Sequence, residues 1–202
     1  MSSLIMSRER VMELLERTGA FRTGHFAHPS GFHAPHYFQM PLALRYADNA
    51  RVLSVSLSRM LRRSRELVAA LPKVSVVAPG AGGVPVAFEI RQALGAEQIF
   101  WAEREAGEIR FRQYNVIQPG QKCVIVDDIA RSGNTIHRVY DMISEAGGEV
   151  LAIGVLVRHT GARIDIPGVP VYSLFEYDSP RYADASECPM CKEGVPTDSV
   201  RY

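Results

Sequence analysis

The chain has 202 residues, of which 47% are hydrophobic, and its 23 basic and 22 acidic residues give a formal net charge of +1. This length and composition predict one folded domain with a sizeable core, and the near-zero charge gives no case for a nucleic-acid or polyanion-binding surface. No apolar run approaches the length of a membrane span, and the first residues lack a signal-peptide core, so a cytoplasmic protein is expected.

The first predicted element is a helix from Ser7 to Thr18. Ser7 can cap its start, and Val11 and Leu14 recur at helical spacing. The helix is followed by residues 21–40, FRTGHFAHPSGFHAPHYFQM, which contain four of the six histidines.

These four histidines allow a zinc site as one interpretation, since imidazole is a common zinc ligand. We do not favour this interpretation. No Cys or acid lies nearby in the sequence, and the segment reads as loops broken by Pro and Gly. The histidines are His25, His28, His33 and His36.

A single helical pattern is predicted from Asp48 to Leu71, and Pro72 closes it. Its basic cluster is interpreted as a solvated helix face, with a subunit contact or the border of the active site as the alternatives. The cluster comprises Arg59, Arg62, Arg63 and Arg65. A first central strand, Val74 to Ala78, comes next.

The sequence PGAGGVP, residues 79–85, follows that strand and precedes a predicted helix from Val86 to Leu94. Glycine lets a backbone approach a ligand closely, so this turn is a candidate binding loop. It lacks the Gly-Lys-Ser/Thr ending of a Walker motif and does not fit Gly-x-Gly-x-x-Gly. A strand from Ile99 to Trp101 and a hairpin from Ala102 to Tyr114, turning near Gly107, are predicted next.

The stretch KCVIVDDIARSGNT, residues 122–135, combines a buried strand, two acids and a turn before a helix-like segment. The strand is predicted from Cys123 to Val126, and Asp127 and Asp128 follow it, where open α/β sheets bind their ligands. The free amides at a helix start attract an anion, whereas the acids suit sugar hydroxyls or a divalent cation. A sugar phosphate ligand is therefore predicted; the alternative is an ordinary strand, turn and helix cap.

A strand from Val150 to Val157 ends in Arg158 and His159, and Val171 to Phe175 is predicted as an edge strand. The tail contains a Cys-x-x-Cys pair, Cys188 and Cys191, which allows half of a zinc site or a redox pair. With Cys123 inside a presumed strand, the chain cannot supply four thiolates. Strands and helices alternate from Val74 onward, which favours an α/β fold whose central, mainly parallel sheet has helices on both faces.

The acid-pair stretch resembles the phosphoribosyl pyrophosphate motif of type I phosphoribosyltransferases. The Gly-His-Phe, Ser-Gly and Tyr-Phe-Gln elements of residues 21–40, together with the Glu-Cys-Pro-x-Cys tail, resemble the orotate branch of that family. The resemblance implies one domain with a hood over residues 1–45, a core sheet over 72–177 and a tail over 178–202. It also implies transfer of a phosphoribosyl group to orotate, Mg²⁺ as cofactor and a homodimer.

The same resemblance implies roles for individual residues. Asp127 and Asp128 would hold the ribose hydroxyls, Arg104 in the hairpin would stabilise departing pyrophosphate, and Tyr37 and Phe38 would contact the base. The 5-phosphate loop would comprise Ala130, Arg131, Ser132, Gly133, Asn134 and Thr135. The pyrophosphate loop would comprise Gly80, Ala81, Gly82 and Gly83. Arg158 and His159 are both candidates for the carboxylate of the base, because a shift of one residue on a strand reverses the side-chain direction.

The chain departs from the family pattern at several positions. Arg131 stands where Thr is usual, and Gly82, Glu108 and Gln113 stand where related enzymes carry a cation. Two other functions therefore stay open beside orotate transfer. One is transfer to a different base, and the other is an inactive regulator that binds phosphoribosyl pyrophosphate.

Overall fold

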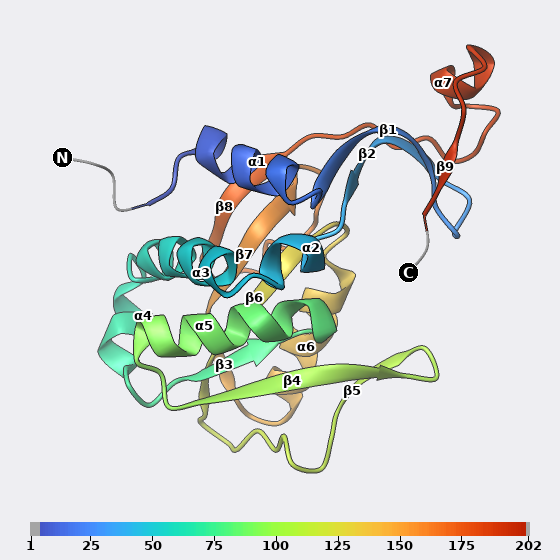
Figure 1. Cartoon of the computed structure of the whole chain (residues 1–202). Helices are drawn as coiled ribbons and strands as arrows, with labels where there is room; N and C mark the ends of the chain where they lie inside the picture. Colours follow the sequence, from blue (N-terminus) through green and yellow to red (C-terminus); the bar gives the residue numbers. More distant parts are fainter. Residues whose placement is uncertain (1–4, 201–202) are drawn as a thin grey trace.

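The computed structural model describes residues 5–200 and contains two sheets (Figure 1). The larger sheet has the strand order β5-β4-β3-β6-β7-β8, and the smaller one, here called the hood sheet, has the order β2-β1-β9. The strands are β1 Phe21–Ala27, β2 His33–Phe38, β3 Ser75–Ala78, β4 Gln98–Glu105, β5 Glu108–Phe111, β6 Lys122–Ala130, β7 Glu149–His159, β8 Val171–Tyr177 and β9 Asp198–Ser199.

The large sheet is parallel except for β5, which pairs antiparallel with β4. Its central strand β6 is buried on both faces: Val124 and Val126 belong to one core cluster, and Cys123 and Ile125 to the other. A continuous apolar run is what a strand covered on both sides requires. The predicted fold class, a mainly parallel sheet between helices, is confirmed.

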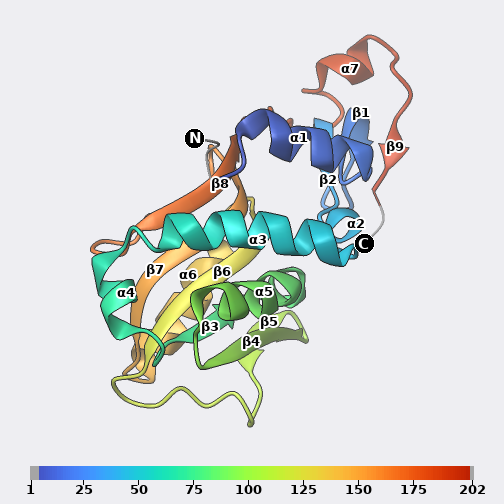
Figure 2. The same cartoon turned by 60° about the vertical axis from the view of Figure 1, so that its left-hand side comes forward.

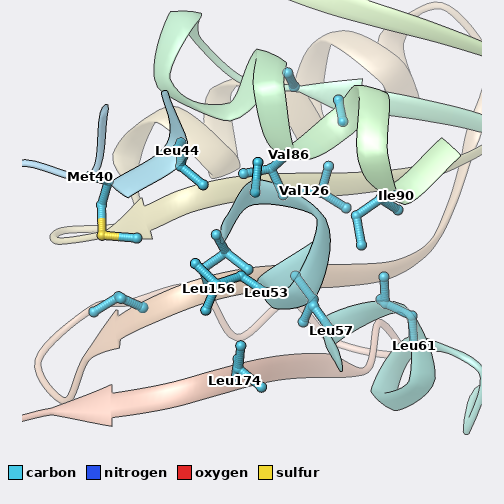
Figure 3. Packing of buried hydrophobic residues seen from close by; sticks show 14 of the residues in the cluster. Met40, Leu44, Leu53, Leu57, Leu61, Val86, Ile90, Val126, Leu156 and Leu174 are labelled. Atoms are coloured by element: carbon cyan, nitrogen blue, oxygen red, sulfur yellow. The ribbon is translucent and has the colours of Figure 1, made fainter. Parts of the chain in front are cut away.

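Helices α3 and α5 cover one face of the sheet and α6 covers the other. Figure 3 shows Leu53, Leu57 and Leu61 of α3 lying over Val126 and Leu156 of the strands. The helices are α1 Arg8–Arg17, α2 Pro41–Leu44, α3 Ala47–Leu61, α4 Arg65–Ala70, α5 Val84–Leu94, α6 Asn134–Glu145 and α7 Pro189–Lys192, with a short 3-10 turn η1 at Ala81–Gly83. Within residues 5–200, none of the helices has the length and apolar character needed to cross a bilayer.

The hood sheet lies at one end of the molecule, where the C-terminal tail returns to the N-terminal hairpin (Figure 2). Strands β1 and β2 pair antiparallel from Phe21 opposite Phe38 to Ala27 opposite His33. The expectation that residues 21–40 form broken loops was therefore wrong. The turn at Gly31, whose φ is +91°, confines the break to the connection and leaves two strands beside it.

Two further expectations need correction. The helix predicted from Asp48 to Leu71 is two helices, because Ser64 starts a new one by accepting a hydrogen bond from the Leu67 amide at 3.2 Å. Strand β6 does not end at Val126 but continues to Ala130, which pairs with Arg158 of β7. The acid pair therefore lies inside the strand near its carboxyl end, and its backbone is fixed by sheet hydrogen bonds.

Candidate functional site

A cleft of about 790 Å³, here called the acid-pair cleft, opens at the carboxyl ends of β3 and β6. Asp128 is buried and Asp127 is half-buried in its floor. Each carboxylate accepts a backbone hydrogen bond: the Asp128 amide donates to Asp127 at 3.0 Å, and the Ile129 amide donates to Asp128 at 2.8 Å. The two acids are thus held in place before any ligand binds.

The glycine turn after β3 packs directly against the two acids. A Cβ atom at Gly82 would lie 2.8 Å from both carboxylate oxygens of Asp128, and one at Gly83 would lie 2.7 Å from Asp127 Oδ1. Gly80, Ala81 and Gly82 line the acid-pair cleft, whereas Gly83 is buried beneath it. Only glycine leaves room for the turn and the acids to meet.

The buried acids have unusual electrostatics. Burial raises the pKa of Asp127 well above its ordinary value, and the neighbouring charge of Asp128 raises it further. Burial also raises the pKa of Asp128, although hydrogen bonds and Arg131 oppose this change. Since burial disfavours the charged form, the pair favours a ligand that brings a cation or hydrogen-bond donors.

The anion loop, residues 132–135, links β6 to α6. Gly133 has a φ of +91°, and a Cβ there would lie 2.0 Å from the Arg163 carbonyl, so the position requires glycine. The Asn134 amide points to Ser132 Oγ at 3.4 Å, and Thr135 lines the acid-pair cleft. The start of this 12-residue helix therefore faces the acids with partial positive charge.

The hairpin of β4 and β5 forms the opposite wall of the cleft. Arg112 pairs with Glu103 at 2.9 Å and with Glu105 at 3.2 Å, and Arg110 pairs with Glu108. Arg104 instead donates to the Gly107 carbonyl at 2.7 Å and lines the cleft. Among the hairpin arginines in the described part of the chain, Arg104 has no carboxylate partner.

A second cavity, here called the aromatic pocket, lies between the hood sheet and the ends of β7 and β8. Its free volume of about 20 Å³ has room for roughly one water molecule, so the hood side chains must shift to admit a larger ligand. Phe38 stacks edge-on against His159 and Tyr177 at centroid distances of 5.8 and 5.0 Å. The pocket is lined by His28, Phe32, Ala34, His36, Tyr37, Phe38, Arg131, His159, Ser179 and Arg181.

The aromatic pocket is electropositive. Burial, together with the charges of Arg131 and Arg181, lowers the pKa of His159 to about 4. The same causes, with His33 in addition, lower the pKa of His28 to about 4. Both imidazoles are therefore neutral near pH 7, and the two guanidinium groups remain as the positive charges that would attract an anion.

The predicted site residues separate into two groups in space. Asp127, Asp128, Arg104, Thr135 and the turn of Gly80, Ala81 and Gly82 line the acid-pair cleft. Tyr37, Phe38, Arg131 and His159 line the aromatic pocket. Ala130 is buried in the core, and Arg158 turns away to pair with Asp165 at 2.8 Å. Of the two candidates at the end of β7, the structure thus brings His159 and not Arg158 to the pocket.

Two features were missed from the sequence. Arg181 lines the aromatic pocket and lies 3.9 Å from the centroid of the Phe32 ring, but the tail around it has no periodic pattern. No Cys lies near the hood histidines in the sequence, but the expectation that none lies near them in the fold was wrong. The tail brings Cys188 and Cys191 against His25 and His33. His28 and His36, the other two candidates for zinc, line the aromatic pocket instead.

Comparisons with known proteins identify one family. Residues 57–177 match the family model described as phosphoribosyl transferase domain. The chain is 32% identical over 188 residues to the orotate phosphoribosyltransferase of Thermotoga petrophila, covering 93% of this chain and 95% of that protein. It is 36% identical over 177 residues to that of Carboxydothermus hydrogenoformans, covering 88% of each. The crystal structure of the Aeropyrum pernix orotate phosphoribosyltransferase shares the fold, with a TM-score of 0.64 and 20% sequence identity. The match covers 82% of this chain and 93% of that one.

Proposed function

This chain belongs to the phosphoribosyl transferase family, and we propose that it transfers the 5-phosphoribosyl group from phosphoribosyl pyrophosphate to orotate, with release of pyrophosphate. The observation that carries the proposal is the position of Arg131. Its side chain lines the aromatic pocket, and the residues directly after it form the anion loop beside the acid pair. A base in the pocket and a sugar phosphate on the loop would therefore meet at the end of β6.

The donor fits the acid-pair cleft by its chemistry. The 5-phosphate would take the amides and hydroxyls of residues 132–135, and the ribose hydroxyls would donate to Asp127 and Asp128. The pyrophosphate would lie against the glycine turn, where backbone amides can approach it without obstruction. Arg104, which has no carboxylate partner among the described residues, is the hairpin cation available to it.

The acid pair also fits Mg²⁺, the cofactor expected from the family. Carboxylate oxygens are ligands of the hard type that Mg²⁺ prefers, and burial makes both acids costly to ionise without a cation nearby. Asp127 and Asp128 would hold the ion through the ribose hydroxyls and the pyrophosphate. When bound, Mg²⁺ would offset the negative charge that the leaving group gains.

The reaction breaks the bond between C1 of the ribose and the pyrophosphate oxygen and forms a bond from C1 to a ring nitrogen of the base. The proton of that nitrogen is lost to solvent. C1 develops positive charge as the pyrophosphate leaves, and the bonding electrons depart with the leaving group. The anion loop and the acids fix the ribose, and Arg104 stabilises the charge on the pyrophosphate. Positioning and electrostatics can each supply several kcal/mol of the acceleration, roughly.

Orotate fits the aromatic pocket better than an uncharged base does. Its ring would stack among Phe38, Tyr37 and His159, and its carboxylate would face Arg131 and Arg181. Because the two histidines are neutral near pH 7, they do not compete with the arginines as cations. The charge of the pocket therefore selects an acidic pyrimidine.

Pyrophosphate release tests the proposal directly. The protein is mixed with Mg²⁺, phosphoribosyl pyrophosphate and one base from a panel of orotate, uracil, adenine and hypoxanthine. Release with orotate alone is the expected result. Release only with another base would show that this base, and not orotate, is the acceptor. Binding of phosphoribosyl pyrophosphate without its turnover in the presence of any base would indicate a regulator.

The homodimer and the cytoplasmic location stay predictions. Large apolar side chains are exposed on neighbouring helices, with Phe88 of α5 at 51% and Val52 of α3 at 41%, and a subunit contact would cover them. Light scattering measures the mass in solution. A monomer at working concentration would contradict the dimer, and a Phe88→Glu variant that turns a dimer into a monomer would locate its interface.

A further inference from the structure

Four metal-binding side chains from the two ends of the chain meet beside the hood sheet. His25 lies on β1 and His33 begins β2, whereas Cys188 precedes α7 and Cys191 lies within it. One ligand atom from each side chain lies within 4.8 Å of all the others, and we call this group the Cys₂His₂ cluster. We propose that the Cys₂His₂ cluster binds one Zn²⁺ ion and thereby fastens the C-terminal tail to the β1–β2 hairpin.

The distances within the cluster fit a tetrahedral zinc site. Zn–S bonds of about 2.3 Å and Zn–N bonds of about 2.0–2.1 Å at tetrahedral angles place the nitrogen and sulfur ligands about 3.5 Å apart. Both sulfur atoms lie 3.5 Å from His25 Nε2, and Cys191 Sγ lies 3.4 Å from His33 Nδ1. The two imidazole nitrogens, 2.8 Å apart, would need to separate by about half an ångström to reach a tetrahedral edge.

The tautomer of His25 favours a ligand role. Its Nδ1 atom lies 2.8 Å from the Val195 carbonyl, which can only accept, so Nδ1 carries the proton. The other nitrogen, Nε2, then presents its lone pair to the two sulfur atoms. A backbone carbonyl that holds the far nitrogen of a metal-bound histidine is a common second partner in zinc sites.

Burial and ligand type favour zinc over the redox pair that the Cys-x-x-Cys spacing also allowed. Cys188 is fully buried, and thiol exchange needs an accessible sulfur. His25 and His33 are also buried, at 2% and 8% exposure. A redox pair of the two cysteines would not explain why two buried imidazoles lie against the sulfur atoms. Two thiolates with two imidazoles suit tetrahedral zinc, whereas Mg²⁺ and Ca²⁺ prefer oxygen ligands. On binding, the two thiols would release their protons to solvent.

The hood sheet needs such a fastening because its own core is small. Three buried hydrophobic residues, Phe26, Tyr37 and Val200, form its cluster, and β9 contributes only two residues to the sheet. So little buried area offsets only a fraction of the entropy lost when the tail is ordered. Figures 1 and 2 both show α7 and β9 beside the β1–β2 hairpin, at the end of the molecule away from α4.

The site would also order the aromatic pocket, a consequence that rests on the proposed function. His33 pairs with Tyr182 through two backbone hydrogen bonds of 2.9 Å, and Arg181, next in the chain, lines the pocket. On the other side of His33, Ala34 lines the same pocket. Loss of zinc would thus loosen the arginine that faces the base and leave the acid-pair cleft unchanged.

Metal analysis of the full chain tests the proposal without any substrate. We expect one zinc per chain after purification without a metal-affinity step, and less than a tenth of that in a Cys188→Ser, Cys191→Ser double variant. Cys123→Ala is the matched control, because Cys123 lies in the core of β6, and it should retain one zinc. Zinc retained in full by the double variant would overturn the proposal, as would a wild-type chain that neither contains nor takes up Zn²⁺.

A second measurement uses the wild-type chain alone, in case the double variant does not fold. Alkylation followed by mass spectrometry should modify Cys188 and Cys191 rapidly only after a zinc chelator such as 1,10-phenanthroline is added. Equal alkylation with and without chelator, or an intact mass showing a disulfide between them, would overturn the site. Co²⁺ in place of zinc should give the visible bands of tetrahedral thiolate coordination.

Kinetics then separate this inference from the proposed function. With Mg²⁺ in excess, the chelator should raise the KM for orotate severalfold and change the KM for phosphoribosyl pyrophosphate much less. A chain that holds zinc but transfers no phosphoribosyl group would refute the proposed function only. An active chain without zinc would refute the metal site only.

Discussion

Gly82 and Asp128 are in such close contact that a Cβ atom at position 82 would lie 2.8 Å from both carboxylate oxygens. A cationic side chain at position 82 would have to displace the acid. At this point of the proposed pyrophosphate loop, only backbone atoms are therefore available to contact a ligand. The close packing of the loop on the acid pair leaves no room for a side chain at position 82 unless Asp128 shifts.

We predict that Gly82→Ala lowers kcat/KM by about 100-fold, because a misplacement of about 1 Å at the reacting centre has that effect. Gly80→Ala is the matched control: its φ of −173° suits any residue, and a Cβ there meets no atom within 4 Å. Steady-state kinetics of both variants check the prediction. Equal losses in the two would mean that the contact with Asp128 is unimportant.

A second prediction concerns the cost of the buried acids. Asp128→Asn should lower kcat/KM by roughly 100-fold, because the amide can no longer accept two ribose hydroxyls or attract a cation. The same change should raise the free energy of unfolding by about 1 kcal/mol, since it removes one of two adjacent buried charges and keeps the oxygen that accepts from Ile129. Urea denaturation measures the second effect, and a less stable variant would contradict the argument.

The sequence predicted the sheet and its central motif well, for a physical reason. A strand buried on both faces must be continuously apolar, and Cys123 to Val126 has that pattern. Acids at a strand end are rare enough to point to a ligand. The break before α4 was missed although Ser64, its cap, was visible, because the apolar spacing continues across it.

The remaining parts depend on contacts between distant residues. Cys188 and His25 are 163 positions apart, and β1 has an irregular register between Thr23 and Phe26, where His25 lies. The choice between Arg158 and His159 depends on which face of β7 each occupies. No local sequence pattern determines the contact between Cys188 and His25 or the choice between Arg158 and His159, so neither could be predicted from the sequence.

A third prediction separates the hairpin arginines. Arg104→Ala should lower kcat by about 100-fold, because Arg104 is available to the leaving pyrophosphate. Arg110→Ala should have a much smaller effect, since Arg110 is already paired with Glu108. Single-turnover kinetics at saturating donor measure both. If Arg110→Ala were the more damaging change, the pair with Glu108 would have to break during the reaction.

A fourth prediction concerns the base. Arg181→Gln should raise the KM for orotate by about 10-fold and leave the KM for phosphoribosyl pyrophosphate nearly unchanged, because it removes one cation facing the carboxylate. Arg45→Gln is the matched control, since Arg45 also lies over an aromatic ring, that of Tyr46 at 5.1 Å, but outside the pocket. An equal rise in the KM for both substrates would show that Arg181 supports the hood as a whole.

The last prediction is a pH dependence of stability that belongs to His159. Burial, with the charges of Arg131 and Arg181, lowers its pKa to about 4 in the folded chain, against about 6.5 in an unfolded one. Between these values the unfolded chain binds more protons, so the free energy of unfolding is fully present above about pH 6.5 and falls as the pH drops toward 4. The full shift corresponds to at most about 3 kcal/mol, less any screening by solvent at this partly exposed ring.

His159→Gln removes the titrating group and should flatten this part of the curve. Urea denaturation of both chains at pH 7, 6, 5 and 4 gives the comparison, and only the difference between the two chains at each pH is used. Taking this difference removes the contribution of all titrating groups that both chains share. Any loss of packing against Phe38 lowers the free energy of unfolding of the variant by the same amount at every pH. Parallel curves for the two chains would show that the pKa of His159 is the same in the folded and the unfolded chain, and the burial and neighbouring positive charge argued for this ring would lose their support.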